Sequence, residues 1–191
     1  MREFIDIDEA TFALGRSYRR RGHGKKGERA AMAHMPPKTG DRYNCLIAVD
    51  TTGGVIAKLC FVGSTTTAVF YAFLCFMVIP AIAGTGQRTL MWDNLSAHFH
   101  VDIDALLAAH GHRSLARPTH SPDFGPVEWA FNHADQFLRH HMMMLDENNF
   151  EAAMHAAFDS IAGADVARYF QAAHYAVPTL PFRPYVGQQV I

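Results

Sequence analysis

The sequence predicts an α/β fold in which helices cover a mixed β-sheet. Three apolar segments of strand type come early in the chain, and the helical segments of the second half alternate with two further short strands. A chain that runs from strands into alternating helices and strands buries its apolar faces best as a mixed sheet flanked by helices. The length of 191 residues, with 49% hydrophobic and 18% charged residues, fits one globular domain with a substantial core.

The strand candidates are short apolar segments bounded by turn formers or charged residues. They are the segments around Phe4–Glu9, Tyr43–Val49, Val55–Val62, Thr89–Trp92 and Arg113–Ala116. The turn sequence Thr51–Gly54 predicts a hairpin between the second and third of these strands. The helix candidates show helical spacing of apolar residues and lie at 68–83, 102–110, 127–141, 149–161 and 165–173.

The segment from Ala68 to Ala83 is strongly apolar, but it is short for a bilayer span and contains Pro80. We interpret it as a buried helix, so no membrane partner is expected. No secretory signal is visible in the first residues, where charge alternates with apolar side chains. The three cysteines, at positions 45, 60 and 75, lack metal-site spacing and suit buried thiols in a reducing compartment.

The charge of the chain is uneven although its net value is −1. Residues 1–43 carry ten Lys and Arg against six Asp and Glu, and residues 44–191 carry seven against twelve. The basic excess includes Arg19, Arg20, Arg21, Lys25 and Lys26. Such a cluster can attract nucleic-acid phosphates, but taken alone it is more typical of a solvated loop.

Three acidic residues lie where a sheet presents functional groups. Asp8 is expected at the end of the first strand, Asp93 follows the strand 89–92, and Glu128 opens a helix after a loop rich in turn formers. Magnesium prefers carboxylate oxygens, and two such ions held by converging acids can activate the attacking oxygen and stabilise the leaving oxygen of phosphoryl transfer. The three acids therefore form a candidate metal site.

The sequence segments around these three acids are more specific for a function than the acids alone. They are Asp8-Glu9-Ala10-Thr11-Phe12, then Asp93-Asn94-Leu95-Ser96-Ala97-His98, then Ser121-Pro122-Asp123-Phe124-Gly125-Pro126-Val127-Glu128. Their order, with 34 residues between Asp93 and Glu128, resembles the DDE transposases of the Tc/mariner superfamily, including its bacterial insertion-sequence branch. The resemblance covers about residues 3–175.

The resemblance implies an RNase H-like fold with a five-stranded mixed sheet, and a DNA endonuclease that cuts transposon ends and joins them to target DNA. It implies that Asp8, Asp93 and Glu128 bind two Mg²⁺ or Mn²⁺ ions. It further implies a homodimer on DNA, placed in the bacterial nucleoid region of the cytoplasm or in a eukaryotic nucleus. Residues 1–177 would form the catalytic domain and residues 178–191 a tail.

Other residues near these words have two interpretations. Asp6 alternates with Asp8 and could share its face; Asp8 is preferred because the Asp-Glu-x-x-Phe word begins there. Asn94 either orients groups beside Asp93 or caps the strand end, and His98 matches the family histidine, which indicates a supporting role rather than ligation. The other histidines lack zinc-site spacing.

Two departures from the family pattern bear on activity. Gly125 stands where the family has Asn, so the turn before Glu128 is expected to lose a side-chain hydrogen bond and gain flexibility. The helix-turn-helix module that recognises inverted repeats is expected to be absent and supplied, if at all, by a separate subunit. We therefore expect weak, largely sequence-independent DNA binding by this chain.

Two other function classes remain open. One is a catalytically inactive transposase remnant that acts as a DNA-binding or interaction module, which absence of magnesium or manganese binding would favour. The other is an RNase H-like nuclease acting on RNA–DNA hybrids or branched DNA, which the fold alone would allow. The Ser121-Pro122-Asp123 word argues against the latter.

Overall fold

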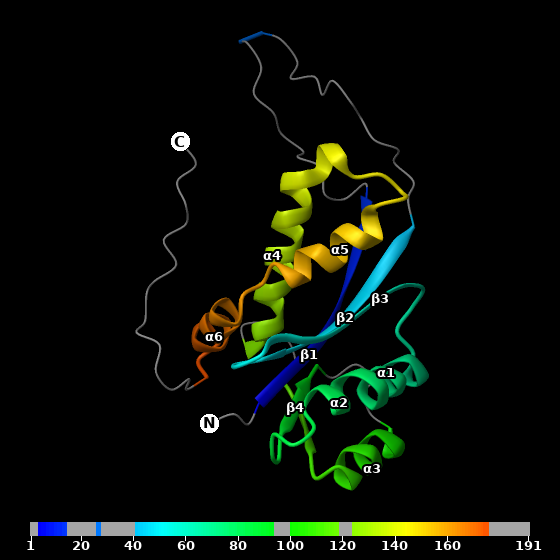
Figure 1. The fold of residues 1–191 in the computed structure, drawn as a ribbon, viewed down its shortest axis with the longest axis vertical. Helices are drawn as coiled ribbons and strands as arrows, with labels where there is room; N and C mark the ends of the chain where they lie inside the picture. The colour runs from blue at the N-terminus through cyan, green and yellow to red at the C-terminus, as the bar shows by residue number, and fades with distance from the viewer. Residues whose placement is uncertain (1–3, 15–25, 28–40, 94–99, 119–123, 176–191) are drawn as a thin grey trace.

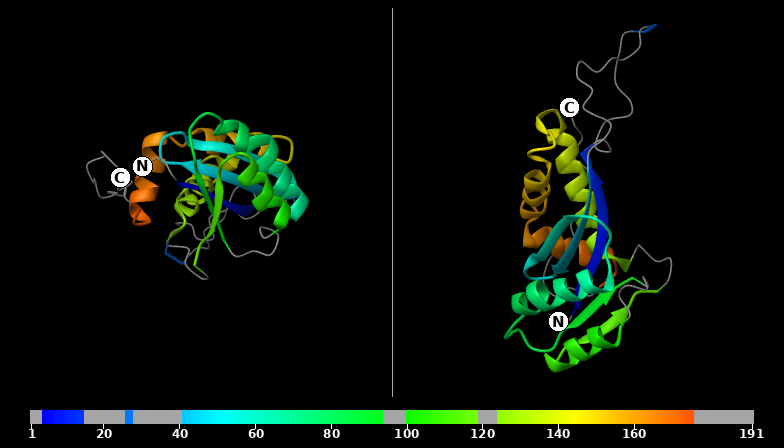
Figure 2. Two further views of the ribbon diagram at one scale, coloured as in Figure 1. Left: turned by 90° about the horizontal axis from the view of Figure 1, so that it is seen from below. Right: turned by 90° about the vertical axis from the view of Figure 1, so that its right-hand side faces the viewer.

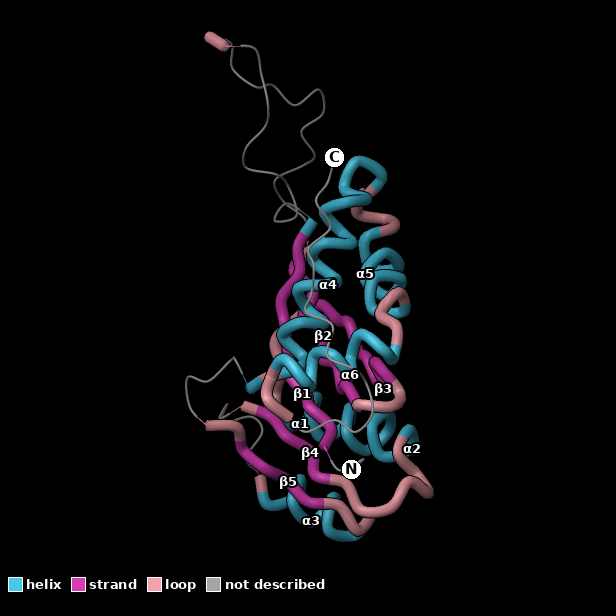
Figure 3. Tube along the Cα trace, turned by 90° about the vertical axis from the view of Figure 1, so that its left-hand side faces the viewer, coloured by secondary structure: helices cyan, strands magenta, loops and turns pink. Residues whose placement is uncertain are grey.

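A five-stranded mixed sheet forms the centre of the molecule. The computed structural model describes residues 4–14, 26–27, 41–93, 100–118 and 124–175. Within these residues the strands are β1 (Phe4–Ala13), β2 (Arg42–Asp50), β3 (Gly54–Val62), β4 (Thr89–Trp92) and β5 (Arg113–Ala116). Their order across the sheet is β3-β2-β1-β4-β5 (Figure 3). The predicted mixed sheet and its five strands are confirmed.

The sheet changes from antiparallel to parallel at β1. Strands β1, β2 and β3 form an antiparallel meander, in which Ile5 pairs with Asp50 and Tyr43 with Val62. On its other side β1 pairs in parallel with β4, and β4 pairs in parallel with β5. Because β1 has a partner on each side, its backbone is fixed more firmly than that of an edge strand.

Helices cover both faces of the sheet. One face carries the helical segment α1 (Thr67–Phe73), η2 (Leu74–Val78) and α2 (Ile79–Ala81), together with α3 (Val101–Ala109). The other face carries α4 (Pro126–His141), α5 (Phe150–Asp159) and α6 (Gly163–Ala172), with the short turn η5 (Met142–Met144) after α4. Figure 1 and the two views of Figure 2 show the sheet between these two groups of helices.

The apolar segment 67–81 is one helical run with a π-helical turn in its middle. The side chain of Thr66 caps it by accepting a hydrogen bond from Val69 N–H at 3.3 Å. Phe70 and Leu74 are fully buried against the sheet, whereas Phe76 is 76% exposed. The prediction of a buried helix is therefore correct for one side of this segment only. No helix among the described residues is long and apolar enough to cross a membrane.

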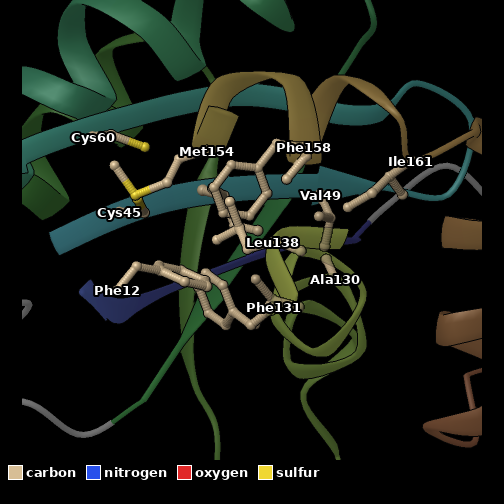
Figure 4. Close-up of a cluster of buried hydrophobic side chains, with 14 of the residues drawn as sticks. Phe12, Cys45, Val49, Cys60, Ala130, Phe131, Leu138, Met154, Phe158 and Ile161 are labelled. Carbon is tan, nitrogen blue, oxygen red and sulfur yellow. The ribbon is translucent and has the colours of Figure 1, made fainter. Parts of the chain in front are cut away.

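The larger apolar cluster lies between the sheet and α4–α6 (Figure 4). Phe158 of α5 packs edge-on against Phe12 of β1 and Phe131 of α4, with ring centroids 5.9 and 6.3 Å apart. Cys45 and Cys60 are buried cross-strand neighbours in this cluster, and both are free thiols as expected. Burial of each such aromatic ring contributes roughly 2–3 kcal/mol, so this cluster holds α4 firmly on the sheet.

Candidate active site

Two acidic residues of β1 face α4. Side chains alternate along a strand, and Ile5 and Ile7 belong to the cluster under α1–α3, which leaves Asp6 and Asp8 on the α4 face. Asp6 is 0% exposed and Asp8 is 9% exposed. The expectation that Asp8 ends the strand is wrong: β1 continues to Ala13 because β2 pairs with it along that whole length. Asp8 therefore lies on a rigid central strand.

Asp93 directly follows the last residue of β4. The parallel ladder ends where Asp6 pairs with Met91, two residues before Asp8 and Asp93, and the charge of Asp93 contributes to the raised pKa of Asp8. On the other side of β4, the N–H of Arg117 donates to the carbonyl of Trp92 at 2.8 Å, which extends the β4–β5 pairing by one residue. Asp8 thus lies on β1, while Asp93 and Arg117 directly follow the neighbouring strands β4 and β5.

Glu128 enters from the first turn of α4, where a negative charge is favoured by the helix dipole. The N-cap residue of this helix is Gly125, which has no side chain to accept a hydrogen bond. The Asp6 carboxylate does so instead, accepting from Val127 N–H at 3.0 Å. The hydrogen bond that the sequence was expected to lose at Gly125 is thus replaced by one from β1, which ties the start of α4 to the sheet.

Arg117 is the residue of this site that the sequence did not reveal. Its Nη2 atom donates to Asp8 Oδ2, and its Nε atom lies 3.7 Å from Asp6 Oδ1. The side chain is 6% exposed. A signal was present, because Arg117 follows the strand 113–116 as Asp93 follows the strand 89–92, and parallel strands end at the same edge of a sheet.

The pKa values show how closely the charges of this site interact. Burial raises the pKa of Asp6 to about 7, although Arg117 and the Val127 N–H both lower it. Burial also raises the pKa of Asp8, opposed by Arg117 and by the Glu9 N–H and reinforced by the charge of Asp93.

The pKa of Glu128 is raised too, first by burial and then by the charge of Asp8, with Asp93 adding to the shift. The pKa of each of Asp6, Asp8 and Glu128 is therefore raised by the charge of at least one other carboxylate, and such a site favours a compensating cation.

The donor set fits a hard divalent cation, since it consists of carboxylate oxygens on a central strand, directly after a neighbouring strand and at a helix start. Among the described residues, however, no three His, Cys, Asp or Glu side chains lie close enough to hold a metal ion as they stand. The cation in contact with Asp8 is the guanidinium group of Arg117. The acids are thus gathered in one region, with the arginine among them.

Two aromatic residues adjoin the start of α4. The hydroxyl of Tyr175 donates to the carbonyl of Phe124 at 3.0 Å, and burial together with the charge of Asp6 raises the pKa of this tyrosine. Trp129 is 45% exposed and stacks on Tyr169 with ring centroids 6.5 Å apart. Trp92, next to Asp93 in the sequence, is buried in the cluster on the opposite face of the sheet.

Several predicted site residues lie outside the described residues. These are Asn94, His98, Arg19, Arg20, Arg21 and Lys25. Lys26 is described and exposed, as a phosphate-binding side chain would be. Two histidines that precede α3 and β5 accept hydrogen bonds from the backbone: His100 caps α3 by accepting from Asp102 N–H, and His112 accepts from Arg88 N–H, both at 3.3 Å.

Comparisons with known proteins agree with this architecture. A family model described as DDE superfamily endonuclease matches residues 3–156. The search of curated proteins finds no match. Among solved structures, the fold is similar to that of the Mos1 transposase paired-end complex with left transposon end, with a TM-score of 0.71 and 16% identity over 89% of this chain and 52% of that one.

Two further structures give the same result. The Mos1 mariner paired-end complex with Mn has a TM-score of 0.68 and 16% identity, covering 90% of this chain and 52% of that one. The catalytic domain of Mos1 mariner transposase has a TM-score of 0.61 and 13% identity, covering 91% and 76%. The chain thus spans about half the length of the Mos1 chains in the two complexes. The predicted RNase H-like fold is confirmed.

Proposed function

Because this chain belongs to the DDE superfamily endonucleases, we propose that it is a transposase-type enzyme that cuts and rejoins DNA phosphodiester bonds with Asp8, Asp93 and Glu128. The observation that carries the proposal is that these acids lie in one region: Asp8 is on β1, Asp93 directly follows the neighbouring strand β4, and the charges of both raise the pKa of Glu128. Structures of the similar Mos1 transposase contain DNA ends with Mg or Mn.

The three carboxylates would hold two Mg²⁺ or Mn²⁺ ions, which when bound supply activation of the attacking oxygen and charge stabilisation of the leaving oxygen. The protein contributes position. Asp8 lies on β1 and Asp93 follows β4, two strands that pair in parallel, and the hydrogen bond from Val127 N–H to Asp6 ties the helical turn that carries Glu128 to the sheet. Small errors in such geometry lower the reaction rate by large factors, so the contacts that position the ligands are expected to affect activity as well.

The partner and the assembly follow from the same proposal. DNA ends and target DNA are the expected substrates, bound as a homodimer, and the basic residues at 19–21, 25 and 26 would contact phosphates. Recognition of one inverted-repeat sequence would require a helix-turn-helix module, in this protein or in a separate subunit. The chain itself is proposed to bind DNA with little sequence preference, and tight binding to a single repeat sequence in a gel-shift titration would contradict this.

The test is metal-dependent nicking of supercoiled plasmid DNA by three variants, Asp8→Asn, Asp93→Asn and Glu128→Gln. Each is expected to lose at least about 100-fold in rate, because loss of a metal ligand removes several kcal/mol of transition-state stabilisation. Asp159→Asn and Glu151→Gln are matched controls on the exposed surface of α5 and should retain activity. A site variant that nicks as fast as wild type would remove that residue from the proposal.

Calorimetric titration with Mg²⁺ or Mn²⁺ separates the enzyme from an inactive remnant of the same fold. An enzyme must bind the ion in the wild-type chain and lose affinity in the Asp8→Asn variant. A folded wild-type chain that binds neither ion would favour the remnant, acting as a DNA-binding or interaction module.

A further inference from the structure

Both carboxylate oxygens of Asp8 already have donors from the protein. Oδ2 accepts from Nη2 of Arg117, and Oδ1 accepts from the N–H of Glu9 at 2.7 Å. The ion pair is largely shielded from water, with the side chains of Arg117 and Asp8 only 5% and 12% exposed. A divalent cation that approaches Asp8 therefore meets an oxygen held by a guanidinium group.

The positive charge of Arg117 opposes such a cation directly. Arginine remains protonated at every pH at which the protein is folded, so it cannot lose its charge to make room. In a site screened little by water, a single and a double positive charge sharing one carboxylate repel strongly. Either the guanidinium group moves away from Asp8, or the ion binds weakly.

The structure offers Arg117 a second carboxylate. Asp6 lies on the same face of β1 two residues away, fully buried, with its Oδ1 atom 3.7 Å from Arg117 Nε. The backbone of Arg117 is held separately, through its N–H on the carbonyl of Trp92. The side chain can therefore transfer from Asp8 to Asp6 while the strand register stays as it is.

We propose that Arg117 is a positioning residue that occupies the cation site at Asp8 before metal binding and is displaced onto Asp6 when a divalent cation binds. This inference rests on the proposed role of Asp8 as a metal ligand. Asp6 also accepts the hydrogen bond from Val127 N–H, next to Glu128. Transfer of the arginine thus concentrates positive charge on the carboxylate that anchors the start of α4, and it couples metal binding to the position of Glu128.

The experiment measures Mn²⁺ affinity by calorimetry in the full chain, without DNA. Arg117→Met keeps a long apolar stem and removes the charge, and it is expected to lower the Kd for Mn²⁺ at least about tenfold, equivalent to about 1.4 kcal/mol. Arg117→Lys keeps the charge without the planar fork and should fall between Arg117→Met and wild type. Arg113→Met, at the other end of β5, is the matched control and should bind as wild type does.

A measurement on the wild-type chain covers the case in which Arg117→Met does not fold. The Nε–H resonance of Arg117, assigned by its loss in Arg117→Lys, should shift on Mg²⁺ titration and saturate with the Kd found by calorimetry. A resonance that does not respond to bound Mg²⁺ would overturn the inference.

The outcomes distinguish this inference from the proposed function. If Asp8→Asn loses Mn²⁺ binding while Arg117→Met binds as wild type does, Asp8 remains a ligand and the role of Arg117 is refuted. If Asp8→Asn binds Mn²⁺ as tightly as wild type, the ligand assignment fails and the inference falls with it. Tighter binding by Arg117→Met, combined with loss of binding in Asp8→Asn, supports both.

Discussion

Asp6→Asn changes how the stability of the protein depends on pH. The substitution removes a buried ionisable group but keeps an oxygen that can accept the hydrogen bond from Val127 N–H. In the folded chain burial raises the pKa of Asp6 from 3.8 to about 7, against the opposing effect of Arg117. Folded protein therefore keeps the Asp6 proton over a pH range in which unfolded protein has released it.

Proton linkage gives the direction and the size of the change in unfolding free energy with pH. The stability that Asp6 contributes is fully present below about pH 4 and is lost as the pH rises through about 7. Within this window the loss is about 1.4 kcal/mol per pH unit. The Asp6→Asn variant does not titrate there, so its free energy of unfolding relative to wild type should rise by about 3 kcal/mol between about pH 5 and about pH 8.

Urea unfolding in the presence of EDTA, at several pH values across this window, measures the difference. Asp8 and Glu128 also have raised pKa values, but they titrate in both proteins, so most of their effect cancels. Asp159→Asn, at an exposed carboxylate, is the control and should give a curve parallel to wild type. A constant difference between Asp6→Asn and wild type would refute the raised pKa, and a difference that falls with pH would show that Arg117 outweighs burial.

Three further predictions concern stability and are all measured by urea unfolding at neutral pH. Arg88→Met should lower the free energy of unfolding by about 3–5 kcal/mol, because it leaves the buried carboxylate of Asp50, which is 3% exposed, without the guanidinium group that lies 2.9 Å away. Adding Asp50→Asn removes that charge and should recover part of the loss. Phe158→Ala should cost about 3–5 kcal/mol, whereas Phe76→Ala, at an exposed ring of the same type, should change stability by less than about 0.5 kcal/mol. Gly54→Ala should cost roughly 1–2 kcal/mol, because Gly54 has a φ of +76° in the turn between β2 and β3; equal stability of variant and wild type would contradict the strain.

The sequence predicted the elements whose signals are local. The bounds of β4 and β5 are as expected, because each is a compact strand of four residues next to a charged or turn-forming residue. The length of β1 was not predictable in this way, because residues 10–13 become a strand through pairing with β2, about 30–35 positions further along the chain. Placing Asp8 at a strand end was an error of the same origin.

In the candidate site, too, the residues with local sequence signals were predicted and those placed by long-range contacts were not. The three acids could be found because ordered sequence motifs surround them, and in the structure the charge of Asp93 contributes to the raised pKa of Asp8. The contacts of Arg117 with Asp8 and of Val127 with Asp6 join residues 109 and 121 positions apart, and no pattern within a short window encodes them. Sequence thus identified the candidate ligands, whereas the groups that position them required the fold.

The alternation of β1 makes the site sensitive to changes in chain length. Insertion or removal of one residue in β1 reverses the alternation on one side of the change only. A change between Asp6 and Asp8 would therefore put these two carboxylates on opposite faces of the sheet, one of them in the apolar cluster under α1. The turn between β2 and β3 takes no part in the pairing of β1 with β4. A change in the length of that turn therefore leaves the β1–β4 register as it is. By contrast, a change of one residue between Asp6 and Asp8 is expected to break the candidate site.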